Sequence, residues 1–147
     1  MPTTRTPRLK ARVALERDDA ILCVLHAKPG REPFWCLPGG NVDDGEDLAA
    51  AAVRELHEEA GVAVAVDAAI LVVDGPGEDA VEVILRGAIA GGEPALGAAS
   101  GDPYLADLAW LPRTSLPADF RPTALRDLLA SAPLGDLPAV PVAAWLP

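Results

Sequence analysis

The sequence predicts a domain of mixed α and β structure, either an α+β fold or an α/β/α sandwich. Apolar segments with strand-like patterns, some separated by short turns, occupy most of the chain, and only two segments have a helical pattern. The 147 residues match the usual size of one domain. No internal repeat or long linker divides them, so residues 1–147 are expected to form a single domain.

The N-terminal part is predicted to form a hairpin followed by a short segment. Residues 9–17 alternate in part between apolar and polar, and Asp18-Asp19 then makes a turn. The apolar run 20–27 suits a buried strand. A loop at 28–32 and a short segment at 34–37 lead to Pro38-Gly39-Gly40 and a further loop.

The remaining elements are predicted from periodicity and from turn residues. Residues 47–60 have a helical pattern that Gly61 should end. Strands are expected at 62–74, 80–89 and 105–111. A Gly- and Pro-rich loop is expected at 91–103, and a second helix at 123–131. The tail from Ala132 is rich in proline and is expected to be irregular and extended.

The charge of the chain limits its partners. The formal net charge of −10 argues against nonspecific binding to nucleic acid, which relies on clustered Lys and Arg. A protein of this charge should also repel phosphates, unless a local group of acids binds divalent cations.

The cysteines and the apolar stretches indicate the compartment. Cys23 and Cys36 are interpreted as buried free thiols in a reducing environment, and no C-x-x-C pair suggests structural zinc. No secretory signal is visible, and the apolar stretches are too short to span a bilayer. We therefore expect a cytoplasmic protein without membrane partners.

Three glutamates share one face of the helix predicted at 47–60. At about 100° per residue, with Glu55 at zero, Glu59 lies at about +40° and Glu58 at about −60°. Arg54 lies beside Glu58, on the flank of this acidic face. An apolar stripe suited to packing on a sheet occupies about +60° to +160° and consists of Ala49, Ala52, Val53, Leu56 and Ala60.

Such a cluster of acids, taken alone, is usually a solvated face whose charges repel one another. The neighbouring residues favour a metal site instead. Carboxylates on adjacent turns can supply the several oxygen ligands that hard divalent cations require. Gly39 and Gly40 lack a Cβ, so the backbone before the helix can approach the same site closely.

Residues 40–62 resemble the Nudix box, G-x5-E-x7-R-E-U-x-E-E-x-G-U, in which U is apolar. All nine specified positions are filled, by Gly40, Glu46, Arg54, Glu55, Leu56, Glu58, Glu59, Gly61 and Val62. A chance match is on the order of one in a million or rarer. The W-x-L-P-G-G lead-in and the flanking strand pattern are also similar to the family. The resemblance implies a Nudix-like α/β/α sandwich with a mixed β-sheet.

The resemblance implies a loop–helix–loop that holds Mg²⁺ or Mn²⁺. The implied metal ligands are Glu55, Glu58, Glu59 and the carbonyl of Gly39. Arg54 would orient the acids by charge-assisted hydrogen bonds. Glu46, paired with Arg54, and Gly40 are implied as supports.

The identity of the general base is left open by the sequence. Glu55 or Glu58 can remove the proton of the attacking water, with Arg54 as the third residue of this catalytic group. Some family members place the base outside the box, where this chain offers Glu93, Asp102 and Asp107.

Candidates for substrate binding lie outside the box. The resemblance favours the basic residues His26, Lys28 and Arg31 for contact with substrate phosphates, together with Asp102 in the later loop. The competing interpretations are that His26 is simply a polar residue at a strand end and that Lys28 and Arg31 are solvated loop residues. The residues considered for stacking on a base are Phe34, Trp35, Tyr104 and Phe120.

Three functions are compatible with a chain of this kind. The complete box favours a catalytic hydrolase of a phosphoanhydride bond over a Nudix-fold binding or regulatory module and over a structural domain. The first choice of substrate is a nucleoside diphosphate linked to another group, such as ADP-ribose. A nucleoside triphosphate, in a sanitising role, is the alternative. A homodimer is possible, because the apolar tail 139–146 can cover either a partner or its own domain.

Overall fold

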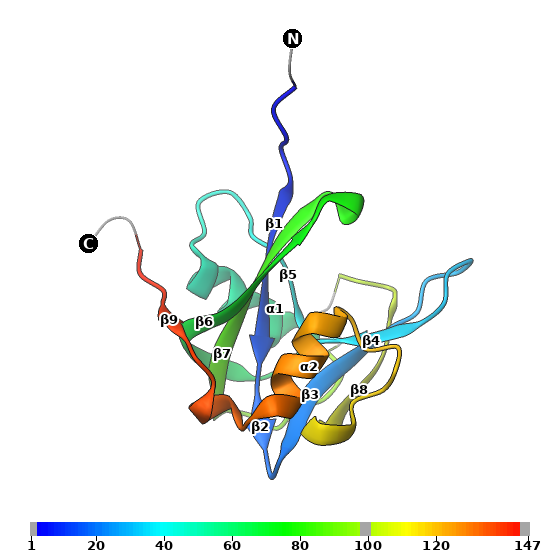
Figure 1. The fold of residues 1–147 in the computed structure, drawn as a ribbon, viewed down its shortest axis with the longest axis vertical. Coiled ribbons are helices and arrows are strands. Elements are labelled where there is room, and N and C mark those ends of the chain that lie inside the picture. The colour runs from blue at the N-terminus through cyan, green and yellow to red at the C-terminus, as the bar shows by residue number, and fades with distance from the viewer. Residues whose placement is uncertain (1–2, 98–100, 145–147) are drawn as a thin grey trace.

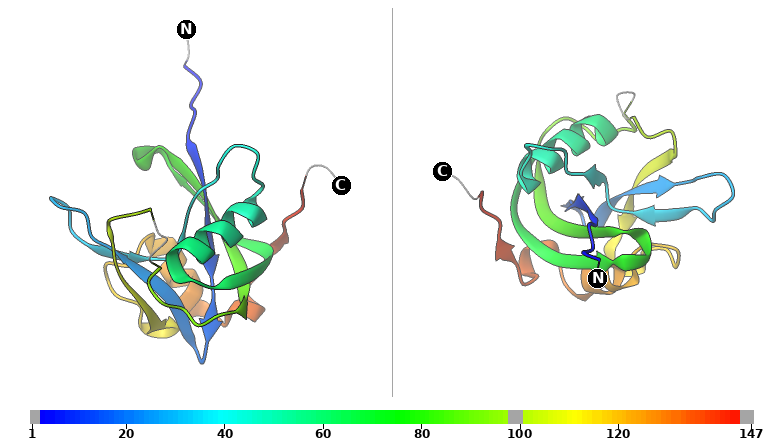
Figure 2. Two further views of the ribbon diagram at one scale, coloured as in Figure 1. Left: turned by 180° about the vertical axis from the view of Figure 1, so that it is seen from behind. Right: turned by 90° about the horizontal axis from the view of Figure 1, so that it is seen from above.

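The computed structural model describes residues 3–97 and 101–144, and two β-sheets separate its two helices (Figures 1 and 2). The helices are α1 (Leu48–Ala60) and α2 (Thr123–Ser131), and three short 3₁₀ turns lie at Pro76–Glu78, Arg113–Ser115 and Leu134–Asp136. The strands are β1 (Arg8–Ala14), β2 (Glu16–Arg17), β3 (Ala20–His26), β4 (Phe34–Cys36), β5 (Gly39–Asn41), β6 (Ala63–Gly75), β7 (Ala80–Gly91), β8 (Leu105–Pro112) and β9 (Val140–Pro141). The predicted mixed α and β sandwich is confirmed.

The larger sheet is mixed and has the strand order β5-β1-β7-β6-β9. Strand β1 pairs in parallel with β7 and antiparallel with β5. In the second pairing Lys10 lies opposite Asn41 and Arg12 lies opposite Gly39. Basic residues of β1 are therefore brought beside the two glycines that precede the acidic helix.

The smaller sheet consists of β2, β3 and β4, with β8 on the other edge of β3. The strand predicted at 9–17 is wrong as one element, because the chain changes sheets at the buried Leu15. Only β2 forms the expected hairpin with β3, through the left-handed Asp18-Asp19 turn. Strand β5 was not predicted, since three residues carry no strand periodicity.

Helix α1 begins and ends close to the predicted residues. The side chain of Asp47 accepts a hydrogen bond from the backbone N–H of Ala50, at 2.8 Å, and caps the N-terminus. Gly61 adopts a φ of 66° and donates its N–H to the carbonyl of His57, which ends the helix.

The face of α1 that packs on the sheet differs from the predicted stripe. Val53 is 42% exposed, whereas Ala51 is fully buried and Glu59 is only 6% exposed. The buried face is therefore rotated toward the acids, and Glu59 points into the protein. A helical wheel shows which residues share a face, but it cannot show where the sheet lies beneath it.

The segment after β7 is fastened to the C-terminal end of α1. The N–H groups of Ala95 and Gly97 donate to the carbonyls of Ala60 and Glu59, at 3.0 and 2.7 Å. The predicted loop at 91–103 is thus anchored before its residues 98–100, which lie outside the described residues. Farther along, the carbonyl of Tyr104 accepts a hydrogen bond of 2.8 Å from the N–H of Ala27, which fastens the residues around Asp102 to the end of β3.

The tail packs on its own domain as far as Val142, and residues 145–147 lie outside the described part. Leu134 and Leu137 are buried, and β9 pairs with Ala68 and Ala69 of β6. The tail is thus more regular than predicted. Both cysteines are buried and free, as expected. Among residues 3–97 and 101–144, no helix is long and apolar enough to cross a membrane.

Candidate active site

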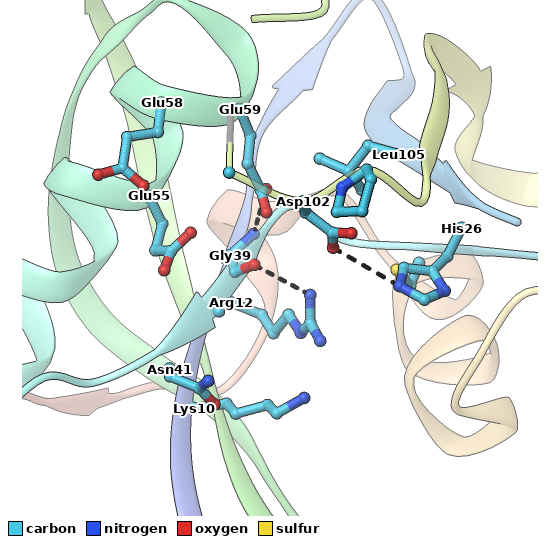
Figure 3. A pocket seen from close by; sticks show the side chains of 14 residues that line it. Lys10, Arg12, His26, Gly39, Asn41, Glu55, Glu58, Glu59, Asp102 and Leu105 are labelled. Carbon is cyan, nitrogen blue, oxygen red and sulfur yellow. Dashed lines mark hydrogen bonds and ion pairs between the residues drawn. The ribbon is translucent and has the colours of Figure 1, made fainter. Parts of the chain in front are cut away.

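A cavity of about 380 Å³ opens between α1, the β1–β5 strand pair and the segment 101–105. Figure 3 shows its polar side chains in three groups. The carboxylates of α1 lie on one side, Lys10 and Arg12 of β1 lie on another, and His26 and Asp102 lie at the third. All three metal-binding glutamates expected from the sequence contribute to its lining.

Glu59 lies at the inner end of the cavity and is almost fully buried. Its Oε2 accepts a hydrogen bond of 2.9 Å from the backbone N–H of Gly39. Burial raises the pKa of Glu59 to about 7, although this bond and the charge of Arg12 oppose the shift. The nearby Glu55 and Asp102 raise the pKa further, so the site disfavours a third bare negative charge.

Glu55 and Glu58 are both held by Arg54. Nη1 of Arg54 lies 3.0 Å from Oε1 of Glu55 and 3.4 Å from Oε2 of Glu58. Burial raises the pKa of Glu55, and the bond from Arg54 counteracts part of this rise. One guanidinium thus offsets the repulsion between two of the three acids.

Arg54 in turn is fixed by the loop before the helix. Its Nε and Nη2 donate to the two carboxylate oxygens of Glu46, at 2.8 and 2.9 Å, and Nη2 also donates to the carbonyl of Asn41. The hydrogen bonds from Arg54 and from the backbone of Asp43 lower the pKa of Glu46 to about 2. The expected contact between Glu46 and Arg54 is present, and it is bidentate.

The two glycines allow the close approach that the sequence suggested. Gly39 has a φ of 141°, which is accessible only to glycine, and a Cβ at this position would overlap the backbone of Ala11. A Cβ on Gly40 would lie 2.7 Å from Oε1 of Glu55. The carbonyl of Gly39, expected to bind metal, accepts a hydrogen bond of 3.2 Å from Nη1 of Arg12.

The donor set suits a hard divalent cation. Three carboxylates and the backbone carbonyl of Gly39 supply only oxygen atoms, which Mg²⁺ and Mn²⁺ prefer. Among the described residues, no group of three His, Cys, Asp or Glu side chains is already arranged around a single metal position. The ligand atoms are therefore of the type that such a cation prefers. In this structure the carboxylates of Glu55 and Glu58 are paired with Arg54.

Of the residues expected to bind substrate, two line the cavity. Nε2 of His26 lies 3.6 Å from Oδ2 of Asp102, and both side chains contribute to the wall. Lys28 and Arg31 are exposed in the β3–β4 loop and do not line the cavity, and Lys28 lies over the ring of Tyr104.

The other two acids weighed as a base are placed elsewhere. Glu93 forms an ion pair of 2.7 Å with Arg17, and the exposed Asp107 accepts a hydrogen bond from the neighbouring N–H of Leu108. Neither contributes to the cavity wall. Asp102 is therefore the acid of this region that the fold brings to the glutamates.

Lys10 and Arg12 were missed in the sequence. Arg12 donates to Glu82 at 2.9 Å and to the carbonyls of Leu37 and Gly39, both at 3.2 Å. The alternation Arg8-x-Lys10-x-Arg12 in a predicted strand was the available signal, because it places three cations on one face. Nothing in the sequence indicated that this face borders the acidic helix.

A sandwich of this topology whose helix brings three carboxylates to a cavity is the arrangement of a Nudix-type hydrolase. A model of the NUDIX domain family matches residues 6–131, so the chain belongs to that family. The expected family resemblance is confirmed, and the chain is a hydrolase of the family.

Curated relatives and solved structures agree with this assignment. A Bacillus subtilis protein named "Putative 8-oxo-dGTP diphosphatase" is 35% identical over 116 residues, which cover 79% of this chain and 73% of that protein. A MutT NUDIX hydrolase from Burkholderia pseudomallei has a TM-score of 0.71 and 29% identity, covering 82% of this chain and 95% of that one. An ADP-ribose pyrophosphatase from Streptococcus suis has a TM-score of 0.61 and 25% identity, with 76% and 78% covered.

The buried position of Glu59 predicts a pH-dependent stability in the absence of metal. Its folded pKa of about 7 lies above the ordinary 4.5, so the folded state prefers the protonated acid. The resulting stabilisation is complete below about pH 4.5 and is lost as the pH rises toward 7. In EDTA, urea unfolding of the wild type should lose about 3 kcal/mol more than Glu59→Gln between pH 4.5 and 8. If the free energy of unfolding changed with pH in the same way for both proteins, the raised pKa of Glu59 would be wrong.

Proposed function

We propose that this chain hydrolyses a phosphoanhydride bond in a nucleotide-type substrate with the help of Mg²⁺ or Mn²⁺. The observation that carries the proposal is the cavity wall made by Glu55, Glu58 and Glu59, closed on one side by the Gly39-Gly40 strand. A phosphoanhydride is a poor electrophile because its negative oxygens repel an attacking water. The site therefore needs a means of offsetting charge and a group that accepts a proton.

Each residue of the site has a role in this proposal. Glu55, Glu58, Glu59 and the carbonyl of Gly39 would hold the metal ion, which when bound withdraws charge from phosphate oxygens and lowers the pKa of water. Arg54 orients Glu55 and Glu58, and Glu46 keeps Arg54 in place.

The reaction requires a proton acceptor in the cavity wall. The water oxygen forms a bond to phosphorus, the bridging P–O bond breaks, and the leaving phosphate keeps the bridging oxygen. A carboxylate takes the proton of the water, and Asp102, Glu55 and Glu58 are the acids in position to do so.

Two substrate classes are supported by different relatives. A nucleoside diphosphate linked to another group, such as ADP-ribose, was the first choice from the sequence, and the Streptococcus suis structure carries the name of such an enzyme. The Bacillus subtilis relative is more similar and is named for 8-oxo-dGTP. A human relative named 8-oxo-dGDP phosphatase is 32% identical over 109 residues, which are 33% of its length. Both names concern an oxidised nucleotide, and the name of the Bacillus subtilis relative favours a nucleoside triphosphate in a sanitising role as the second candidate.

A substrate panel tests the proposed function. The purified chain is incubated with Mg²⁺ or Mn²⁺ and with dGTP, 8-oxo-dGTP, ADP-ribose or a UDP-sugar, and the products are identified by mass spectrometry. Cleavage of a phosphoanhydride bond that depends on the metal supports the proposal. Absence of turnover on every compound with both metals would contradict it.

Metal binding should stabilise the folded chain. The unfolded chain separates Glu55, Glu58 and Glu59, so a divalent ion should bind the native state preferentially. At ten to a hundred times Kd the gain is roughly 1.4 to 2.7 kcal/mol, or several degrees in Tm. Thermal melting in MgCl₂ should therefore exceed melting in NaCl of matched ionic strength, and Glu58→Gln should reduce the difference. Equal shifts in both salts would indicate that the acids are only a solvated face.

A further inference from the structure

Lys10 is a half-buried cation that lines the active-site cavity without a direct partner. It is one of two lysines in the chain, and the other, Lys28, is exposed outside the cavity. Among residues 3–97 and 101–144, no side chain or backbone group forms a hydrogen bond or ion pair with the Lys10 ammonium. Ordering a lysine in this way has a cost in side-chain entropy and desolvation, which an anionic ligand can offset.

Glu82, the acid opposite Lys10 on β7, is already engaged. Oε1 of Glu82 accepts the hydrogen bond of 2.9 Å from Nε of Arg12, in a pair whose two side chains are both largely buried. Arg12 is also held by the carbonyls of Leu37 and Gly39. Arg12 therefore has a structural role in positioning Gly39, whereas the Lys10 charge is left for a ligand. Burial and the neighbouring Arg12 lower the pKa of Lys10, and the charge of Glu82 opposes this shift only in part.

The position of Lys10 gives the cavity two ends of opposite charge. Lys10 lies on β1 opposite Asn41, beyond Arg12, and Glu55, Glu58 and Glu59 lie on the other side of Gly39 in Figure 3. A polyphosphate chain matches this arrangement. The phosphate to be attacked lies at the glutamates, and the phosphate farther along the chain extends toward β1.

We propose that Lys10 binds the terminal phosphate of a nucleoside triphosphate, and this inference rests on the proposed function. A terminal phosphate carries about −1.5 to −2 charge at neutral pH, and it has three free oxygens. In a nucleoside diphosphate linked to a sugar, the second phosphate carries a single charge and is esterified. A lysine binds phosphate as a point charge, so it gains most from the terminal, more highly charged group. Lys10 thereby favours triphosphates over linked diphosphates.

Substitution of Lys10 tests this proposal, because the loss of a phosphate contact should raise KM and leave kcat nearly unchanged. For Lys10→Met with Mg²⁺ and dGTP, KM should rise about 10- to 100-fold, the loss expected for a hydrogen bond to a charged group, while kcat changes less than about threefold. KM for ADP-ribose should change less than about threefold. Lys10→Arg should recover most of the dGTP affinity. Arg126→Met removes one positive charge from α2, remote from the cavity, and serves as the control for net charge.

A binding measurement keeps the inference separate from catalysis. Calorimetry with inorganic tripolyphosphate and Mg²⁺ should give about 10-fold weaker binding to Lys10→Met than to the wild type or Arg126→Met. An unchanged affinity and an unchanged KM for dGTP would overturn the inference, as would equal losses for dGTP and ADP-ribose. If the wild type cleaves no nucleotide, the proposed function fails, and the tripolyphosphate measurement still decides the role of Lys10. Melting curves confirm that each variant is folded, and Lys10→Gln replaces Lys10→Met if the latter is not.

Discussion

Glu58→Gln and Glu59→Gln should each lower kcat by at least about 10²-fold while the fold stays intact. The amide keeps the shape of the side chain and removes the charge that a divalent cation requires. In Glu59→Gln the new amide oxygen can still accept the hydrogen bond from the N–H of Gly39, so the strand β5 keeps its contact with α1. The loss should therefore appear in turnover rather than in stability. Steady-state kinetics with saturating Mg²⁺, beside circular dichroism, measure both.

Glu78→Gln is the matched control for this experiment. Glu78 lies in the 3₁₀ turn between β6 and β7, and its side chain does not line the cavity. The same change of glutamate to glutamine should leave its kcat within about twofold. If Glu58→Gln and Glu59→Gln also retained activity within a factor of a few, with unchanged circular dichroism, the assignment of these carboxylates to metal binding would be wrong.

Local sequence patterns predicted the helix that carries the site, and the structure explains why. Asp47 caps the helix and Gly61 ends it, and both effects depend on the conformations of one or two residues. The box also placed Glu46 beside Arg54, because Glu46 lies just before the helix and Arg54 lies in its second turn. Features of this kind need no knowledge of the rest of the fold.

Other features depend on contacts between distant segments, and the sequence did not reveal them. The rotation of α1 that buries Glu59 and exposes Val53 is set by the sheet beneath the helix. The change of sheets at Leu15 is set by the pairing of β1 with β5 and β7. That pairing also brings Lys10 and Arg12 to the cavity from a strand that precedes the box by thirty residues or so along the sequence.

The choice among the acids outside the box also depends on contacts between distant segments. The sequence favoured Asp102 only modestly over Glu93 and Asp107, and tertiary structure separates the three acids. Glu93 pairs with Arg17, Asp107 is exposed, and Asp102 faces the cavity. Asp102 is held there by the N–H of Tyr104, whose carbonyl in turn accepts a hydrogen bond from the N–H of Ala27.

Asp102→Asn should lower kcat by about 10²- to 10⁴-fold, the range of a general base, and should change KM much less. Oδ1 of Asp102 accepts a hydrogen bond of 2.8 Å from the N–H of Tyr104, and Oδ2 lies 3.6 Å from Nε2 of His26. An asparagine can keep the first contact through its own oxygen, so the loop should retain its shape. It cannot accept a proton from water. The variant therefore removes the chemical role with little change in the structure.

Asp107→Asn is the control, because it makes the same substitution five residues later at an exposed position that does not line the cavity. Its kcat should stay within about twofold of the wild type. A pH–rate profile adds a second test, since loss of the base should abolish or shift the acidic limb of kcat, whereas a purely structural change should scale the whole profile. If Asp102→Asn retains near-normal kcat, the base lies inside the box. Glu55 is then favoured, because its carboxylate lines the cavity and lies beside Gly40.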